Sequence, residues 1–248
     1  MLLLPVAMTA SKSVNLLSVN SILVSNWGSI SINTLARNGR INLSSDDNYK
    51  VMFNNAFGSE IIDSITVTNA LAQFMRTMIS GNSKYDKYLR GDPGVQLSDL
   101  EEEGMDIFSR EGSVNGTGGD CFHCHNSVDG LFQSQEAHNN ALDATFTDLG
   151  LGGVSGYYGD NGKFKVPSLR NVEFTAPYMH DGRFSTLEEV IDHYNSGGHF
   201  STTVSPFMKN IDEGLHLSIS QQQALIAFLK TLSDQEFISN SAFSNPKG

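Results

Sequence analysis

The sequence predicts an all-α protein of short helices and long loops. Apolar residues recur at helical spacing in several segments, and capping boxes, in which a serine precedes a glutamate or glutamine by three residues, mark helix starts. No segment shows the apolar and polar alternation of a half-buried strand, and no internal repeat is present. The connections are rich in glycine, serine and asparagine. Together these observations favour helices joined by loops over a sheet-based fold.

The first predicted helix lies between Thr66 and Gly81, because apolar residues repeat at helical spacing there and the glycine provides a stop. Residues 84–94 follow as a polar stretch that contains glycine, aspartate and proline near its end, and we expect a connection here. The border between two domains, residues 1–92 and residues 93–248, falls near the end of this stretch.

Three more helices are predicted downstream. Their capping boxes pair Ser98 with Glu101, Ser185 with Glu188, and Ser220 with Gln223. An apolar stripe accompanies each box, so each helix has one face that can be buried. Residues 126–165 are rich in glycine, and we expect them to form loops that border a cofactor.

Composition and charge exclude several classes of function. The chain has 248 residues, 39% of them hydrophobic, which is enough to bury a core. Its longest apolar run, at residues 1–8, is interrupted by Pro5 and is too short to span a membrane. A net charge of −11 argues against nucleic acid as a partner. The first basic residue, Lys12, follows the apolar run instead of preceding it, so no export signal is visible.

One motif carries chemistry: Cys121-Phe122-His123-Cys124-His125, a Cys-x-x-Cys-His run. Thiols three residues apart on a helical turn lie on one side, so both can bond one porphyrin edge while the imidazole of His125 binds the iron. The motif therefore predicts one covalent haem c. A redox dithiol would need a βαβ setting, and a zinc site would need two further ligands. His123 is expected to be an exposed bystander.

Three segments downstream are as distinctive as this motif. They are KVPSLRNV at 165–172, TAPYMHDGRF at 175–184 and TLEEVIDHY at 186–194. Together with the haem motif and residues 74–92, they resemble the bacterial diheme cytochrome c peroxidases and the related methylamine-utilisation diheme enzyme. The resemblance covers the larger part of the chain.

In that family, two cytochrome c-like domains each carry one haem. The N-terminal haem has an open iron site and reacts with peroxide, and the C-terminal haem stores and passes electrons. The motif here matches the C-terminal haem, so the resemblance implies a cytochrome c-like haem domain preceded by a remnant of a second helical domain. It further implies reduction of hydrogen peroxide to water with electrons from a small cytochrome c or copper protein, a periplasmic location and a homodimer.

The resemblance implies Tyr194 as the distal ligand of this haem iron, opposite His125, with Met179 as the rival. Helical spacing independently favours Tyr194, because it follows Leu187 by seven residues and shares its stripe, whereas His193 projects roughly 100 degrees away. A thioether ligand would raise the haem potential and a phenolate would lower it. The alternative is a core tyrosine whose hydroxyl is hydrogen-bonded.

Five further residues take roles from the same resemblance. His180 belongs to a turn beside the haem, where it would bond a propionate, lie in the electron path or only stabilise the turn. Arg170 and Arg183 would neutralise propionates, with ordinary surface ion pairs as the alternative. The family also binds calcium between its domains through backbone oxygens, here those of Thr175 and Pro177.

This sequence departs from the family pattern at two points, and these departures limit which functions of the family can be expected of this chain. Only one Cys-x-x-Cys-His motif is present, and residues 4–8 resemble an Asn-Pro-Val-Glu-Met segment in which Ala7 replaces the glutamate that acts as acid and base. We therefore predict no catalytic side chain and interpret the chain as a truncated C-terminal portion of a diheme peroxidase. The alternatives are a stand-alone monohaem electron-transfer cytochrome, a methylamine-type oxidase and an inert fragment.

Overall fold

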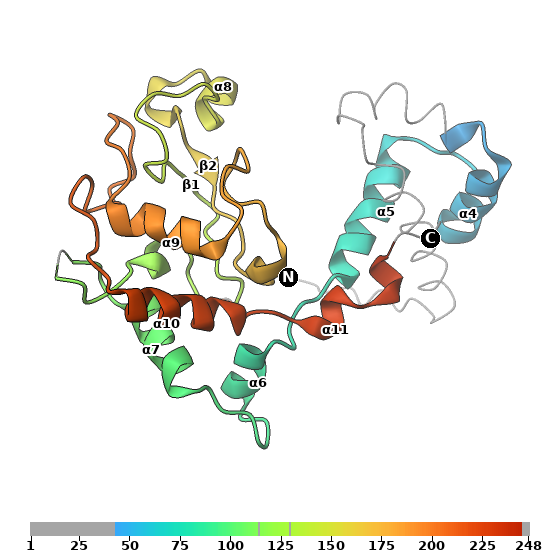
Figure 1. The fold of residues 1–248 in the computed structure, drawn as a ribbon. Coiled ribbons are helices and arrows are strands. Elements are labelled where there is room, and N and C mark those ends of the chain that lie inside the picture. The colour runs from blue at the N-terminus through green and yellow to red at the C-terminus, as the bar shows by residue number, and fades with distance from the viewer. Residues whose placement is uncertain (1–42, 114, 129, 245–248) are drawn as a thin grey trace, which may run out of the picture. The chain divides into compact units, whose positions relative to one another are not determined.

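The computed structural model describes residues 43–113, 115–128 and 130–244, which form two compact units (Figure 1). The described part of one unit comprises residues 43–79 and 236–244, and the other unit comprises residues 80–235. The segment at residues 4–8, with Ala7, lies outside the described residues. The division falls between Ile79 and Ser80, earlier than the border expected near residue 92.

Hydrogen bonds explain the position of this division. The backbone N–H of Asn82 donates to the Asp234 carboxylate at 2.9 Å, and the N–H of Tyr85 donates to the carbonyl of Thr231 at 3.0 Å. Both acceptors follow the last long helix of the larger unit. The stretch 84–94, expected to be a connection, therefore begins with helix α6 (Lys84–Arg90), which is capped by Ser83 and belongs to that unit.

The smaller unit is built on helices α4 (Asp47–Phe57) and α5 (Ser64–Thr77), with the short helix α11 (Gln235–Ile238) at its border and the 3₁₀ turn η5 (Ser241–Phe243) after it. A small apolar cluster that includes the fully buried Phe53 and Ala70 joins α4 to α5. The predicted first helix is thus confirmed, but it starts at an Asp63–Thr66 capping box and ends before Gly81.

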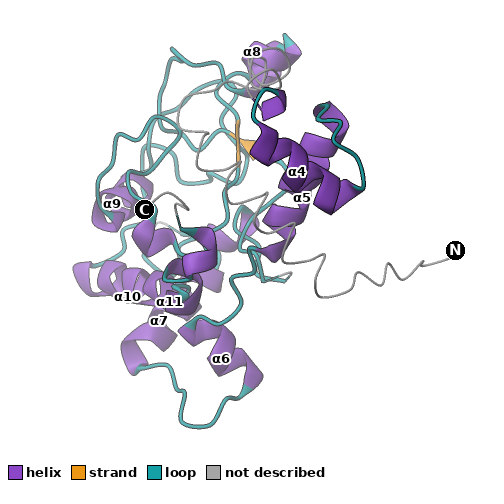
Figure 2. Ribbon diagram, turned by 90° about the vertical axis from the view of Figure 1, so that its right-hand side faces the viewer, coloured by secondary structure: helices purple, strands orange, loops and turns teal. Residues whose placement is uncertain are grey.

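The core of the larger unit lies between α7 (Asp99–Ser109), α9 (Leu187–Ser196) and α10 (Ile219–Lys230). Helices α7 and α10 run side by side (Figures 1 and 2). Their backbones come so close at Gly104 that a Cβ there would overlap the carbonyl oxygen of Ala224. Buried phenylalanines, among them Phe108 and Phe228, fill the space between the helices.

The capping boxes were predicted with mixed accuracy. Ser98 with Glu101 is confirmed at the start of α7. For the other two helices the predicted serines are wrong, and the boxes pair Thr186 with Glu189 and Ser218 with Gln221. The cap is the residue that keeps an extended backbone directly before the first helical residue, and neighbouring hydroxyls make that choice ambiguous in the sequence.

Residues 126–165 are mostly loop, as predicted, with a few short elements. Strands β1 (Ala137–His138) and β2 (Phe164–Lys165) pair antiparallel, with Ala137 opposite Lys165 and His138 opposite Phe164. The other short elements are α8 (Leu151–Ser155) and η3 (Tyr158–Asp160), followed downstream by η4 (Val172–Phe174).

The largely helical class is confirmed, and the small sheet is the exception to the all-α prediction (Figure 2). Within the described residues, every helix is too short or too polar to cross a membrane.

Candidate haem site

The haem motif forms a tight turn that packs against helix α7. Its first three residues make the 3₁₀ turn η2 (Cys121–His123), and the N–H of His125 closes the next turn on the carbonyl of Cys121 at 2.9 Å. Just before it, the N–H of Gly119 donates to the carbonyl of Ile107 at 2.8 Å. The motif is therefore anchored to the core helix that precedes it.

Both cysteines and His125 line a cavity of about 530 Å³. This volume is in the range of pockets that hold small-molecule cofactors, and helices α9 and α10 give it an apolar wall. That wall includes Leu187, Val190, Ile191, Leu225 and Leu229. Cavity and motif therefore suit a large, flat, mostly apolar group such as a porphyrin.

The imidazole of His125 is oriented by the backbone. Its Nδ1 lies 3.1 Å from the carbonyl oxygen of Phe132, which can only accept, so Nδ1 carries the proton and Nε2 keeps its lone pair. Burial lowers the pKa of His125 and outweighs the opposing effect of the Phe132 and Pro167 carbonyls. A neutral imidazole with a free Nε2 is the form that binds a metal.

The two thiols remain protonated in this cavity. Burial raises the pKa of Cys121 to about 12 and that of Cys124 to about 11. Reactive dithiols instead have lowered pKa values, so the redox alternative loses support. Zinc also finds no support here: among the described residues, neither cysteine belongs to a group of three or more histidine, cysteine and carboxylate side chains that could hold a metal ion.

The two candidate distal ligands line the same cavity. The hydroxyl of Tyr194 accepts a hydrogen bond from Asn140 Nδ2 at 3.2 Å, and the same nitrogen lies 3.3 Å from the sulfur of Met179. Burial raises the pKa of Tyr194 to about 12, although the Asn140 hydrogen bond opposes this. The structure therefore brings both candidates together around one amide.

His193, which is expected to project away from the stripe of Tyr194, is also buried. It is 8% exposed, and its Nε2 lies 3.1 Å from the carbonyl oxygen of Asn140. The loop after β1 covers this side of α9, so a second face of the helix is buried. Burial lowers the pKa of His193, with the Asn140 carbonyl acting in the opposite direction.

Asn140 is the site residue that sequence reasoning missed. Its backbone is held by His193, and the preceding Asn139 is fully buried, with its amide donating to Ser201 and Thr203 at 3.0 and 3.1 Å. The only available signal was its place in the loop expected to border a cofactor. An asparagine in a loop gives no local pattern that separates a ligand-positioning role from a turn.

Three more predicted residues, Thr175, Pro177 and His180, also line the cavity. The ring of His180 stacks on Phe164 with centroids 3.8 Å apart and an interplanar angle of 13°. This contact ties the turn to strand β2, in keeping with the turn-stabilising alternative. The calcium ligation expected of Thr175 and Pro177 stays a prediction.

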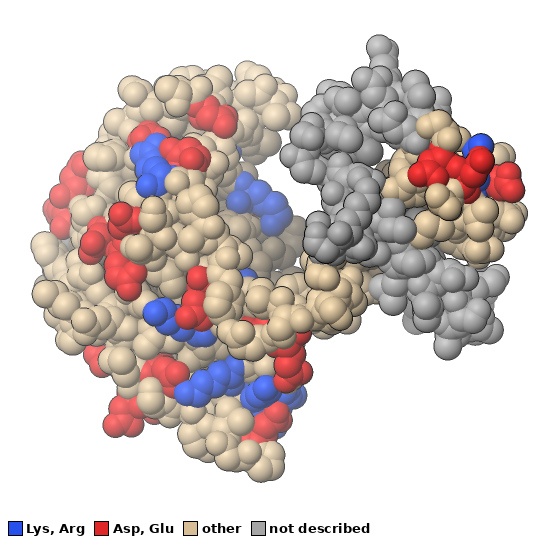
Figure 3. Space-filling model, turned by 45° about the vertical axis from the view of Figure 1, so that its right-hand side comes forward, with Lys and Arg blue, Asp and Glu red and all other residues tan. Residues whose placement is uncertain are grey.

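Neither predicted arginine lines the cavity. Arg170 makes a two-pronged ion pair with Asp86, at 2.8 and 2.9 Å, and Arg183 is shared between Asp143 and Asp181. Each guanidinium is thus paired with carboxylates in the structure, and the propionate role stays a prediction. Basic and acidic side chains also lie next to one another on the face of the larger unit in Figure 3.

A Cys-x-x-Cys-His turn on an apolar cavity of cofactor size is the mark of c-type haem proteins. The family model described as "Di-haem cytochrome c peroxidase" matches residues 32–94. The methylamine utilization protein MauG of Methylorubrum extorquens is 36% identical over 187 residues, which cover 74% of this chain and 49% of that protein. Cytochrome c551 peroxidase of Nitrosomonas europaea is 32% identical over 197 residues, covering 76% and 50%.

A crystal structure of a MauG-like protein associated with microbial copper homeostasis superposes with a TM-score of 0.72 at 33% identity, covering 88% of this chain and 67% of that one. The chain belongs to the family of diheme cytochrome c peroxidases and MauG proteins. It spans about half the length of the curated relatives it matches.

Proposed function

We propose that residues 80–235 hold one covalent haem c and act as the electron-transfer domain of a cytochrome c peroxidase, which reduces hydrogen peroxide to water. The observation that carries the proposal is the shared cavity of Cys121, Cys124, His125 and the two candidate distal ligands. The alternative is a stand-alone monohaem cytochrome that transfers electrons without peroxidase activity. The single Cys-x-x-Cys-His motif keeps this alternative open.

An electron relay fits the cavity better than a peroxidatic site does. The Nε2 of His125 in the motif can bind the iron. The hydroxyl of Tyr194 or the sulfur of Met179 can supply the second ligand atom. A haem iron with two protein ligands has no open position for peroxide. The cavity therefore supports storage and transfer of electrons.

Of the two distal candidates we propose Tyr194. It lies on α9, a regular helix fixed by its capping box and its buried face, whereas Met179 lies in a turn with a left-handed backbone (φ 71°). The amide of Asn140 donates to the phenolic oxygen and so stabilises negative charge on it. A nearby ferric ion would favour the phenolate and oppose the rise in pKa that burial causes.

A bound haem c supplies an iron centre that takes up and releases one electron. Cys121 and Cys124 would attach it, and the Nδ1–H of His125 on the Phe132 carbonyl fixes the ring plane and the free Nε2. Helices α9 and α10 give one side of the site an apolar wall. In a site of low dielectric the few remaining polar groups then tune the potential strongly.

The wider setting is proposed from the family alone. The electron donor would be a small cytochrome c or a copper protein, the location periplasmic and the assembly a homodimer. The relatives named above are a methylamine utilization protein and a cytochrome peroxidase. A calcium ion on the backbone oxygens of Thr175 and Pro177 belongs to the same set of proposals.

The test is the optical spectrum of the haem-loaded protein, ferric and ferrous, before and after addition of hydrogen peroxide. Tyr194→Phe is compared with Met179→Leu and with the control Tyr178→Phe. Tyr178 also lines the cavity, but its hydroxyl donates to the carbonyl of Val172 at 2.9 Å. We expect one haem per chain by pyridine haemochrome assay and a changed spectrum in Tyr194→Phe alone.

The response of the spectrum to hydrogen peroxide distinguishes an electron-relay haem from a peroxidatic one. A relay haem leaves the wild-type spectrum unchanged by peroxide, and peroxide-driven oxidation of a reduced small cytochrome is then absent in this chain alone. If peroxide shifts the spectrum and the donor is consumed catalytically, this single haem performs the peroxidase chemistry and the relay proposal is wrong.

A further inference from the structure

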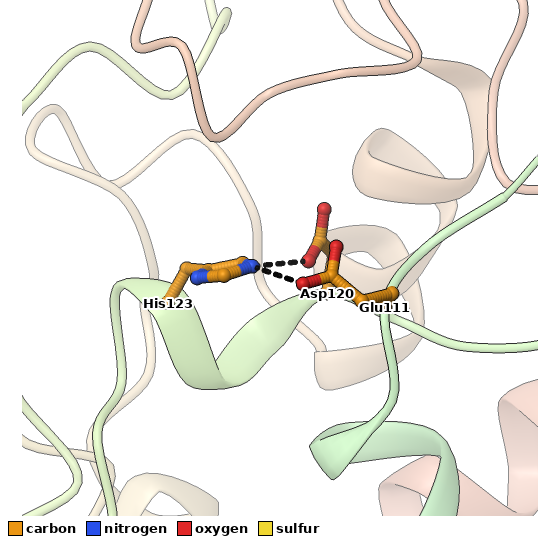
Figure 4. A group of neighbouring side chains, drawn as sticks. All are labelled: Glu111, Asp120 and His123. Atoms are coloured by element: carbon orange, nitrogen blue, oxygen red, sulfur yellow. Dashed lines mark hydrogen bonds and ion pairs between the residues drawn. The ribbon is translucent and has the colours of Figure 1, made fainter.

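Glu111, Asp120 and His123 form a cluster at the haem motif, to which His123 itself belongs (Figure 4). Its His123 Nε2 is 3.0 Å from Glu111 Oε1 and 3.1 Å from Asp120 Oδ1. The His123 side chain is 22% exposed, and its ring stacks on Phe207 with parallel planes and centroids 5.0 Å apart. His123 is therefore partly buried and not exposed as expected.

The spacing of these atoms is that of ligands around one metal ion. All three ligand atoms lie within 4.8 Å of one another. Bonds of roughly 2.0–2.2 Å from one zinc ion to a histidine nitrogen and carboxylate oxygens leave neighbouring ligand atoms roughly 3–3.5 Å apart. The two distances from His123 are already close to this value.

In the structure the cluster already holds one cation, the ammonium of Lys209. This ammonium pairs with Glu111 and lies 3.4 Å from Asp120 Oδ2 and 3.2 Å from His123 Nε2. A metal ion in place of the Lys209 ammonium would accept one lone pair from each of His123, Glu111 and Asp120.

The buried carboxylate of Asp120 shows that this place requires a cation. Its side chain is only 7% exposed, and its Oδ2 makes no hydrogen bond. The cation near this oxygen is the Lys209 ammonium at 3.4 Å, which also pairs with Glu111. A buried carboxylate oxygen without a hydrogen bond is costly unless a cation compensates it.

We propose that Glu111, Asp120 and His123 form a site for a divalent transition-metal ion of the zinc class. One imidazole nitrogen with two carboxylate oxygens suits such an ion, whereas calcium and magnesium prefer oxygen ligands alone. Lys209 is the competing internal cation: its side chain is 38% exposed, so it can swing into solvent when the metal binds.

The test is zinc titration of the haem-loaded protein, made without a histidine tag and freed of metal ions by a chelator. Calorimetry gives the affinity, and elemental analysis gives the zinc content. We expect one zinc ion per chain, with binding at least about tenfold weaker in Glu111→Gln and in His123→Gln, because each variant loses one of three ligands. Lys209→Met should bind zinc about tenfold more tightly, because it loses the competing charge.

Glu136→Gln is the matched control, because its carboxylate lies 3.7 Å from His138, outside the cluster. It should bind zinc as the wild type does. The proposal is overturned if the protein binds no zinc, if Glu136→Gln weakens binding as much as Glu111→Gln does, or if Lys209→Met fails to tighten it.

Discussion

Replacing Arg170 by methionine tests whether this guanidinium serves the fold or a haem propionate. In the structure its two terminal nitrogens bond both oxygens of Asp86, at 2.8 and 2.9 Å, and its Nε donates to the carbonyl of Gly130 at 2.6 Å. Both charged side chains are largely buried, at 14% and 11% exposed. Loss of the arginine therefore leaves a carboxylate in a poorly solvated place.

The expected cost follows from that geometry. Removing one partner of a buried ion pair costs about 3–5 kcal/mol. Asp86 keeps two hydrogen bonds from Ser83, at 2.7 Å to the hydroxyl and 2.9 Å to the backbone N–H, which offset part of this cost. We expect Arg170→Met to lower the free energy of unfolding by about 2–4 kcal/mol at pH 7.

The way in which the stability loss of Arg170→Met changes with pH follows from the pKa of Asp86. Burial raises the pKa of Asp86, but hydrogen bonds from Arg170 and Ser83 outweigh it and hold the pKa below the ordinary value of 3.8. The wild-type contribution is therefore complete above that value and is lost as the pH falls through the lower, folded-state pKa. In Arg170→Met burial dominates and the pKa rises. Its deficit against the wild type should shrink as acid protonates Asp86.

The assay is urea unfolding of the haem-loaded protein, followed by circular dichroism at pH 7 and at about pH 4. The double variant Asp86→Asn with Arg170→Met should recover much of the loss, because no charge stays buried. Arg183→Met is the control: its ion pairs are about one-third exposed, so we expect a cost of about 0–1 kcal/mol. Wild-type stability of Arg170→Met, combined with a shifted haem potential, would refute the reasoning and favour the propionate role.

Three further predictions concern the helices and the distal ligands. Gly104→Ala should lower the free energy of unfolding, measured by thermal unfolding, by about 1–3 kcal/mol or more, because the new Cβ overlaps a carbonyl of α10. Gly153→Ala is the control and should be tolerated, because the nearest atom to its Cβ is 3.6 Å away. Asn140→Leu removes the hydrogen-bond donor to both candidate ligand atoms, so the ferric spectrum should change and the free energy of unfolding should fall by about 1 kcal/mol. An unchanged spectrum would exclude a positioning role for Asn140. Thr186→Ala should cost about 1 kcal/mol in urea unfolding, and Ser185→Ala should cost less, since Thr186 is the helix cap; equal effects would contradict this assignment.

The sequence by itself determined the features that depend on near neighbours along the chain. The haem motif is readable because two thiols and an imidazole need a fixed local spacing, which Cys121, Cys124 and His125 provide. The long helices are readable because one apolar stripe and one cap are local properties, as at α7. The inward position of Tyr194 followed from the same periodicity.

Tertiary structure alone decided which polar groups meet. Asp86 and Arg170 are 84 residues apart in the sequence, Asn140 and Tyr194 are 54 apart, and Lys209 reaches His123 across 86 residues. Helical spacing placed His193 away from the stripe of Tyr194, but it cannot show that a loop packs on that side and buries the ring. A polar side chain can serve a cofactor, an ion pair or solvent, and only the folding of distant segments onto one another selects among them, since burial and partner are properties of that packing.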